Sequence, residues 1–343
     1  MKRYIVTLFI IIFCRSVCYG KLPKIVGLVQ VRNEEETVEQ CLRGLAVYTD
    51  AIVVLDDNSC DKTRSIVSRL AQELHVETII EQPYSGWQKT TEAHNRQTLL
   101  EAGRAIGGTH FVLIDADELF MATCNQNNWL RKKILSLRSG QVLSFPMVNV
   151  WGSVHNYRDD ALLSPYHGVW RKKPVVFHDD GRCSYVNQDT QGIGASKVLH
   201  ECRVPRNLVC PLMKKQIIIT SINHGIVHFK WACLDNIYCK KAWYMMLEYI
   251  RACQNSSDTV ANARKIINYY DGWEFKGAMP DEKNVTLKPV PKEWYAYPFF
   301  HETGYMTVNR MRRKDIRQWI NTYGLKYFSL FKFNMFILLN TPV

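Results

Sequence analysis

Two aspartates that lie two positions apart are the first candidates for chemistry. Asp115 and Asp117 follow a short apolar run over residues 109–114. In an extended chain end, residues two apart point to the same side, so we expect the two carboxylates to lie together. Neighbouring carboxylates repel each other unless a cation lies between them or one keeps its proton. We therefore expect Mg²⁺ or Mn²⁺ with phosphate oxygens and water there, the alternative being a solvated acidic turn.

A second acidic turn, Asp56 and Asp57, follows the apolar run 51–55. A carboxylate after a strand can accept hydrogen bonds from a base imide or from ribose hydroxyls. The sequence has no phosphate-binding glycine loop and no G-x-G-x-x-G after its first apolar run. A nucleotide would therefore have to be held by acids and a metal.

The elements that position these turns alternate along the chain. Buried strands are predicted over 24–31, 51–55, 76–80 and 109–114, and helices between them over 38–45, 66–74 and 91–105. Such connections fit crossovers, so the sheet should be parallel, with its ligand site beyond the carboxyl ends of the strands. We predict an α/β protein: a mostly parallel, Rossmann-like nucleotide-binding sheet with helices on both faces and an irregular C-terminal half.

The second half of the chain has weaker periodicity. Helices are predicted over 129–137 and 233–253, and strands over 142–150 and 217–222. The predicted division is 1–20 as signal or anchor, 21–120 as the nucleotide-binding half, 121–304 as the acceptor and metal-completing half, and 305–343 as a basic, aromatic tail.

The first 20 residues have the layout of a secretory signal, because Lys2 and Arg3 precede a short apolar stretch that ends in small residues. An uncleaved anchor or a buried first strand is the alternative. We expect the protein to be exported or membrane-associated, or else to lie on the cytosolic face of a membrane. The 11 cysteines show neither a disulfide framework nor a zinc spacing.

The net charge of +12 is concentrated at the C-terminus, where residues 305–343 carry seven basic residues and one acid. Together with its aromatic residues, this tail could make a peripheral contact with anionic lipid, or it could pack on the sheet with a solvated basic face. Nucleic acid is not an expected partner, because no helix-turn-helix, zinc or RNP signature accompanies the charge.

Three runs carry a resemblance to a known family: VQVRNEEETVEQCL, VVLDDNSCDKT and HFVLIDADELF. Over residues 24–120 the chain resembles family 2 glycosyltransferases, which have the nucleotide-sugar-binding GT-A fold. Carried over by position, the resemblance implies that Asp57 contacts the base, with Asp56 beside it. It implies that Asp115 lies near the ribose and the metal-bound diphosphate, and that Asp117 is the main metal ligand.

Further roles follow from the same resemblance. Arg32 and Glu34 would line the base and ribose end, and Glu118 belongs to the DADE variant of the motif. Arg96 would contact the diphosphate, although Asn95-Arg96 reverses the order often found in the family.

In the second half, the sequence HGIVHFKW resembles the region of the late histidine that completes the metal shell, with His228 as the candidate. A hydrogen-bonded core histidine is the alternative for His228 and for His224. The resemblance implies inversion at the anomeric carbon with a carboxylate as general base. Glu201, in Leu-His-Glu, is the first candidate base and Asp180 the second, with Asp179 and Asp160 also possible.

The expected reaction is the metal-dependent transfer of a sugar from a nucleoside-diphosphate sugar to a hydroxyl of a glycan, lipid-linked or protein acceptor. The Q-x-x-R-W motif of processive synthases is absent, so the transfer should be non-processive. Two alternatives remain: a metal-dependent phosphatase, and a non-catalytic glycan-binding protein on a transferase fold.

Overall fold

The computed structural model describes residues 22–82, 92–159, 173–185, 208–209, 216–233 and 286–306 of the 343. The segment 1–20, residues 234–253 of the helix predicted over 233–253 and residues 307–343 of the basic tail lie outside these residues. So do two candidate catalytic bases, Glu201 and Asp160. Within the described part, no helix is long and apolar enough to cross a bilayer.

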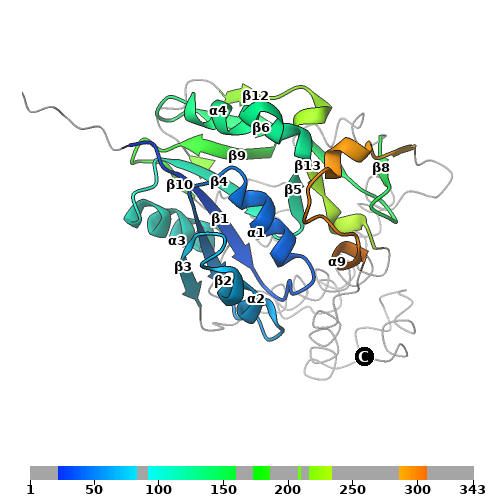
Figure 1. Cartoon of the computed structure of the whole chain (residues 1–343). Helices are drawn as coiled ribbons and strands as arrows, with labels where there is room; N and C mark the ends of the chain where they lie inside the picture. Colours follow the sequence, from blue (N-terminus) through cyan, green and yellow to red (C-terminus); the bar gives the residue numbers. More distant parts are fainter. Residues whose placement is uncertain are drawn as a thin grey trace, which may run out of the picture.

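A seven-stranded sheet forms the centre of the molecule (Figure 1). Its strands, in spatial order, are β12 (Gln216–Ile218), β6 (Val142–Phe145), β9 (Lys173–His178), β4 (His110–Asp115), β1 (Ile25–Val31), β2 (Ala51–Asp56) and β3 (Val76–Glu81). The pairs formed by β1 with β2, β1 with β4, β2 with β3 and β6 with β12 are parallel. Strand β9 runs antiparallel to both β4 and β6. The predicted α/β class with a mostly parallel sheet is confirmed.

Helices cover both faces of the sheet, as predicted. Helices α1 (Val38–Ala46) and α2 (Thr63–Leu70) pack on one face, where they share a core with Val29 and Ile52. On the other face, α3 (Glu92–Ala105) packs against Leu28 and Val53. Successive strand residues thus enter opposite cores, which explains why these strands are apolar throughout.

The strand predicted over 142–150 is wrong as a single element, because the chain leaves the central sheet at Pro146. After this residue, β7 (Met147–Asn149) joins a small sheet in the order β5 (Glu118–Phe120), β13 (Ile226–His228), β7. Proline has no N–H to donate to a strand ladder. Its carbonyl oxygen instead accepts the backbone N–H of Ile226 at 2.9 Å, and this bond starts the pairing of the small sheet.

The last described segment returns to the first half of the chain. It contains β14 (Leu287–Pro289), which pairs with β8 (Asn156–Arg158), and then η7 (Lys292–Tyr295) and α9 (Thr303–Met306). Gln40 of α1 exchanges two hydrogen bonds with the backbone of His301, and the hydroxyl groups of Tyr48 and Tyr297 lie 2.5 Å apart. The remaining elements are η1 (Ala122–Asn128), α4 (Trp129–Leu135), β10 (Ser184–Tyr185), β11 (Leu208–Val209), η3 (Ile222–His224) and η4 (Phe229–Trp231).

Candidate functional site

The strand register brings the predicted polar turns to one edge of the central sheet. Near the end of β1, Val31 pairs with Asp56 of β2 on one side, and Gln30 pairs with Asp115 of β4 on the other. The turns that follow β1, β2 and β4 therefore lie side by side at the carboxyl ends of parallel strands. This edge is where open α/β sheets bind ligands.

The turns after β1 and β2 are hydrogen-bonded to each other. The backbone N–H of Asn33 donates to Ser59 Oγ at 2.9 Å, and that of Cys60 donates to Asn33 Oδ1 at 2.8 Å. The N–H of Glu34 donates to Thr63 Oγ1 at 2.8 Å. Asn33 adopts a φ of 52°, a left-handed conformation that asparagine tolerates better than most residues. These hydrogen bonds hold the two turns in a fixed position relative to each other.

The two acids of the second turn have different surroundings. Asp56 is 2% exposed, its Oδ1 accepts the N–H of Ser59 at 2.7 Å, and its Oδ2 lies 3.4 Å from Arg64 Nε. Asp56 therefore holds the turn. Asp57 is half-buried, with Oδ2 3.8 Å from Arg32 Nη1. Burial raises the pKa of Asp57 above its ordinary value, and the charge of Arg32 opposes that rise.

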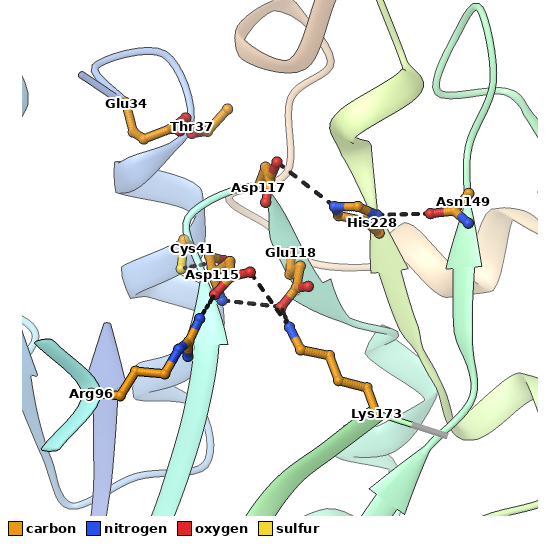
Figure 2. A network of polar contacts seen from close by, with 10 residues as sticks. All are labelled: Glu34, Thr37, Cys41, Arg96, Asp115, Asp117, Glu118, Asn149, Lys173 and His228. Carbon is orange, nitrogen blue, oxygen red and sulfur yellow. Dashed lines mark hydrogen bonds and ion pairs between the residues drawn. The ribbon is translucent and has the colours of Figure 1, made fainter. Parts of the chain in front are cut away.

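Glu34 lies where the chain enters α1. Its Oε2 accepts the hydroxyl of Thr37 at 3.1 Å, and its carbonyl oxygen accepts the N–H groups of Thr37 and Val38 at 3.0 and 2.9 Å. The side chain of Glu34 is thereby tied to Thr37 where the helix begins, beyond the carboxyl end of β1 (Figure 2). Its predicted contact with the base and ribose end of a nucleotide stays a prediction.

The two aspartates of the D-x-D pattern have different partners (Figure 2). Asp115 lies 3.1 Å from Arg96 through Oδ1 and 3.7 Å from Lys173 Nζ through Oδ2. Asp117 Oδ2 instead faces His228 Nε2 at 3.7 Å. The physical reason is that the chain does not stay extended after β4: it turns at residues 116–117 and enters β5. Asp115, predicted as a metal ligand, is thus in contact with two cations.

Four charged residues, three of them buried, form a group beside this turn: Arg96, Lys173, Glu118 and the half-buried Asp115. Arg96, Lys173 and Glu118 are 3%, 6% and 1% exposed. Lys173 Nζ donates to Glu118 Oε2, which also accepts the backbone N–H of Asp115 at 3.0 Å. Burial raises the pKa of Glu118 and lowers that of Lys173, and the attraction between their charges opposes both changes. Arg96, Asp115, Lys173 and Glu118 balance in charge, and together they fix the β4–β5 turn.

Lys173 and Asn149 are the site residues that sequence reasoning missed. The antiparallel register of β9 pairs His178 with His110 and Val176 with Val112, so Lys173 comes beside the end of β4. Nothing in the sequence around Lys173 distinguishes a buried lysine from an exposed one. Asn149 did leave a signal, because it is a lone amide in the apolar run around residues 147–150.

His228 joins Asp117 to the small sheet. Strand β13 pairs His228 with Glu118 of β5 and with Asn149 of β7. His228 Nδ1 lies 2.7 Å from Asn149 Oδ1, and the next residue, Phe229, donates its N–H to the carbonyl of Asp117 at 2.9 Å. An imidazole hydrogen-bonded through one nitrogen, with the other facing a carboxylate, is a donor set that fits Mn²⁺.

His224, the other histidine of this stretch, is placed differently. Its ring stacks on Trp129, with the ring centroids 4.2 Å apart. It belongs to η3 and precedes β13, whereas His228 ends that strand. The side chain of His224 is half-buried against Trp129, and the core role that the sequence left open for it stays a prediction.

Asp180, the second candidate base, lies at the opposite edge of the sheet. Strand β9 carries Lys173 at the carboxyl edge and His178 at the amino edge, and its six residues span about 16 Å. Asp179 and Asp180 follow His178, so their position argues against either acting as base beside Asp117. Asp179 forms two 2.7 Å hydrogen bonds with Arg104. Among the described residues, the group of three possible metal ligands whose donor atoms lie within 4.8 Å of each other is Asp179, Asp180 and Cys183, at this amino edge.

Comparison with known proteins adds to this geometry. No curated protein matches the chain. Several solved structures resemble it at low sequence identity. S. aureus TarS 1-349 in complex with UDP is 15% identical, with a TM-score of 0.40 over 76% of this chain and 73% of that one. The mannosyltransferase PcManGT from Pyrobaculum calidifontis, in complex with GDP-Man and Mn²⁺, is 16% identical, with a TM-score of 0.36 over 75% and 73%.

A third similar structure is glucosyl-3-phosphoglycerate synthase from Mycobacterium tuberculosis, in complex with Mn²⁺, UDP and glucosyl-3-phosphoglycerate. It is 16% identical, with a TM-score of 0.32 over 78% of this chain and 88% of that one. Scores this low do not define the relationship, which is carried by the sequence of the first half. Residues 28–127 match glycosyl transferase family 2. This stretch holds the turns after β1, β2 and β4, so the part of the chain that carries the candidate site matches a family of glycosyltransferases.

Proposed function

We propose that the protein transfers a sugar from a nucleoside-diphosphate sugar to an acceptor hydroxyl, with Mn²⁺ or Mg²⁺ held by Asp117 and His228. One observation carries the proposal. Asp117 Oδ2 and His228 Nε2 face each other at 3.7 Å. They lie at the carboxyl edge of the central sheet, the same edge at which Asp57 follows β2. A direct charge-assisted N–H···O bond is about 2.7–2.9 Å long, so the longer separation leaves room for a third group that both atoms contact.

The donor would lie across the three turns. Asp57 would accept a hydrogen bond from the base, with Arg32 beside it, while Glu34 would face the ribose. Arg96 and Lys173 hold Asp115 in place, so Asp115 would accept hydroxyl groups of the ribose or the sugar instead of ligating a metal. A bound divalent cation would offset the negative charge that develops on the departing diphosphate.

Inversion at the anomeric carbon, with a carboxylate that takes the proton of the acceptor hydroxyl, remains part of the proposal. Glu201 stays the first candidate base, and it lies outside the described residues. A glycan, a lipid-linked sugar or a protein could supply the hydroxyl. Export or membrane association through residues 1–20, with the cytosolic membrane face as the alternative, is proposed on the sequence of that segment alone.

A donor-panel hydrolysis assay tests the function. The full chain is incubated with uridine and guanosine diphosphate sugars, with Mn²⁺ or after removal of metal by EDTA, and the release of nucleoside diphosphate is measured. We expect release from one class of donor, and only with metal. Phosphate release from a simple phosphoester, without donor hydrolysis, would favour the phosphatase alternative. Glycan binding with no affinity for any donor would favour the non-catalytic one.

A further inference from the structure

The polar contact between His228 and Asn149 lies outside residues 28–127, the segment that matches the glycosyltransferase family. His228 ends β13 and Asn149 ends β7, and the register of these parallel strands makes them direct cross-strand neighbours. Asn149 Oδ1 lies 2.7 Å from His228 Nδ1 (Figure 2). The carboxamide oxygen has no hydrogen to donate, so the contact is a hydrogen bond only when Nδ1 carries the proton.

This constraint fixes what the other ring nitrogen can do. With the proton of the neutral ring on Nδ1, the lone pair lies on Nε2, and Nε2 is the atom that faces Asp117 Oδ2 at 3.7 Å. The opposite tautomer would direct an N–H toward Asp117 and would leave Asn149 Oδ1 facing a lone pair. The amide therefore selects the form of the imidazole that can bind a cation.

The backbone around Asn149 keeps the amide in place. The N–H of Val150 donates to the carbonyl of His228 at 3.2 Å, and Trp151 donates its N–H to the carbonyl of Asn156 at 2.9 Å. Val150 also forms an isolated antiparallel bridge with Tyr157. The end of β7 is thus held both by β13 and by the chain that follows it, so Asn149 cannot move far without breaking backbone bonds.

We propose that Asn149 is a positioning residue: it selects the Nδ1–H tautomer of His228 and so directs the Nε2 lone pair toward the cation site shared with Asp117. This inference rests on the proposed metal site and adds a residue to which the comparisons assign no role. Partners of this kind, which orient a metal-binding histidine, typically change metal affinity by about 10–100-fold when they are removed.

Two variants and a control test the role in the full chain. Asn149→Leu removes the acceptor at similar size, whereas Asn149→Asp keeps an oxygen acceptor. Asn223→Leu is the matched control, because Asn223 Oδ1 also accepts a ring N–H, that of Trp294 at 3.2 Å, away from Asp117. Mn²⁺ affinity is measured by titration in the presence of UDP or GDP. The tautomer of His228 is read from ¹⁵N-histidine NMR without metal, with His228→Gln used to assign the signals.

We expect wild-type His228 to be protonated at Nδ1. We expect Asn149→Leu to lose that preference and to bind Mn²⁺ about 10–100-fold more weakly, while Asn149→Asp and Asn223→Leu stay within about threefold of wild type. Wild-type Mn²⁺ affinity in the Asn149→Leu variant, or an Nε2–H tautomer in wild type, would overturn the inference and leave the proposed function standing. If the wild-type protein fails to bind Mn²⁺ both in the presence of UDP and in the presence of GDP, the metal site itself is refuted, and the inference with it.

Discussion

At the carboxyl edge of the central sheet, Asp117 faces His228 across 3.7 Å, whereas at the amino edge Asp179 forms two 2.7 Å bonds with Arg104. Both acids come just after a strand, and the sequence marks both as candidates. Asp179 has each carboxylate oxygen occupied by one guanidinium, which is the geometry of a structural ion pair. Asp117 Oδ2 and His228 Nε2 lie farther apart than the atoms of a direct charge-assisted hydrogen bond, and the proposed metal site rests on this spacing. Acids at the two edges of one sheet are therefore told apart by the distance and chemistry of their partners.

The largest expected effect is a loss of donor hydrolysis when the acid at the carboxyl edge is changed but not when the acid at the amino edge is changed. Asp117→Asn removes a charge from the proposed metal site, so donor hydrolysis should fall by about 10²–10³-fold, a loss typical of removing one group that stabilises the transition state. The measurement is the initial rate of nucleoside diphosphate release at saturating Mn²⁺.

The matched control for that variant is Asp179→Asn at the amino edge. It should keep the rate within about threefold of wild type while lowering the free energy of unfolding by about 1–3 kcal/mol, because the bidentate pair with Arg104 is lost. Equal losses of activity in the two variants would mean that the contrast between the edges has no functional meaning.

The next effect is a loss of stability when one of the buried charges beside the β4–β5 turn is removed. Lys173→Met leaves Glu118 and Asp115 with one cation fewer in a buried setting, and should reduce the free energy of unfolding by about 3–5 kcal/mol in urea denaturation. The double variant Lys173→Met with Glu118→Gln should recover much of that loss, since the more deeply buried of the two acids beside Lys173 is then neutral. A double variant less stable than Lys173→Met alone would contradict this account of the turn.

The smallest expected effect concerns pH and the turn after β2. Burial raises the pKa of Asp57, so its carboxylate takes up a proton at a higher pH than a free aspartate does. In the proposed donor complex, the ionised form of Asp57 is the stronger hydrogen-bond acceptor for the base. The donor KM should therefore rise a few-fold as the pH falls from about 8 to about 5, toward the range in which carboxylates titrate.

The control for the pH effect is Asp57→Asn, which has no ionisable group at that position. Its donor KM should be higher than that of wild type near neutral pH and should vary less as the pH falls. A wild-type KM that does not change with pH would remove Asp57 from the donor site.

The sequence predicts the first four strands, the helices between them and the edge where their polar turns meet. These features depend on local periodicity and on the fixed direction of parallel crossovers, both of which are visible over short stretches. The resemblance to family 2 implies roles for Asp57, Asp117 and His228 that stay predictions, and the structure places these residues at one edge of the sheet.

Two features could not be predicted, and a third could be predicted only in part, because they depend on contacts between distant parts of the chain. The different partners of Asp115 and Asp117 follow from the turn into β5 and from the cations that α3 and β9 supply to Asp115. The position of Asp180 follows from the antiparallel direction of β9, which short apolar runs do not reveal. The break of the strand at Pro146 had a visible signal in the proline itself, but the sheet that the chain joins next is set by β13.

The position of β9 between β4 and β6 has a consequence for folding during synthesis. Strand β4 pairs with β1 on one side, but its other side pairs with β9, which is synthesised about 60 residues later. Until those residues leave the ribosome, the nascent domain exposes a long apolar strand edge, which is the kind of surface that joins other chains. Arrival of β9 closes that edge and delivers Lys173 to the acidic turn in the same event. The strand that covers the exposed edge of β4 is thus also the strand that brings a buried cation beneath the β4–β5 turn.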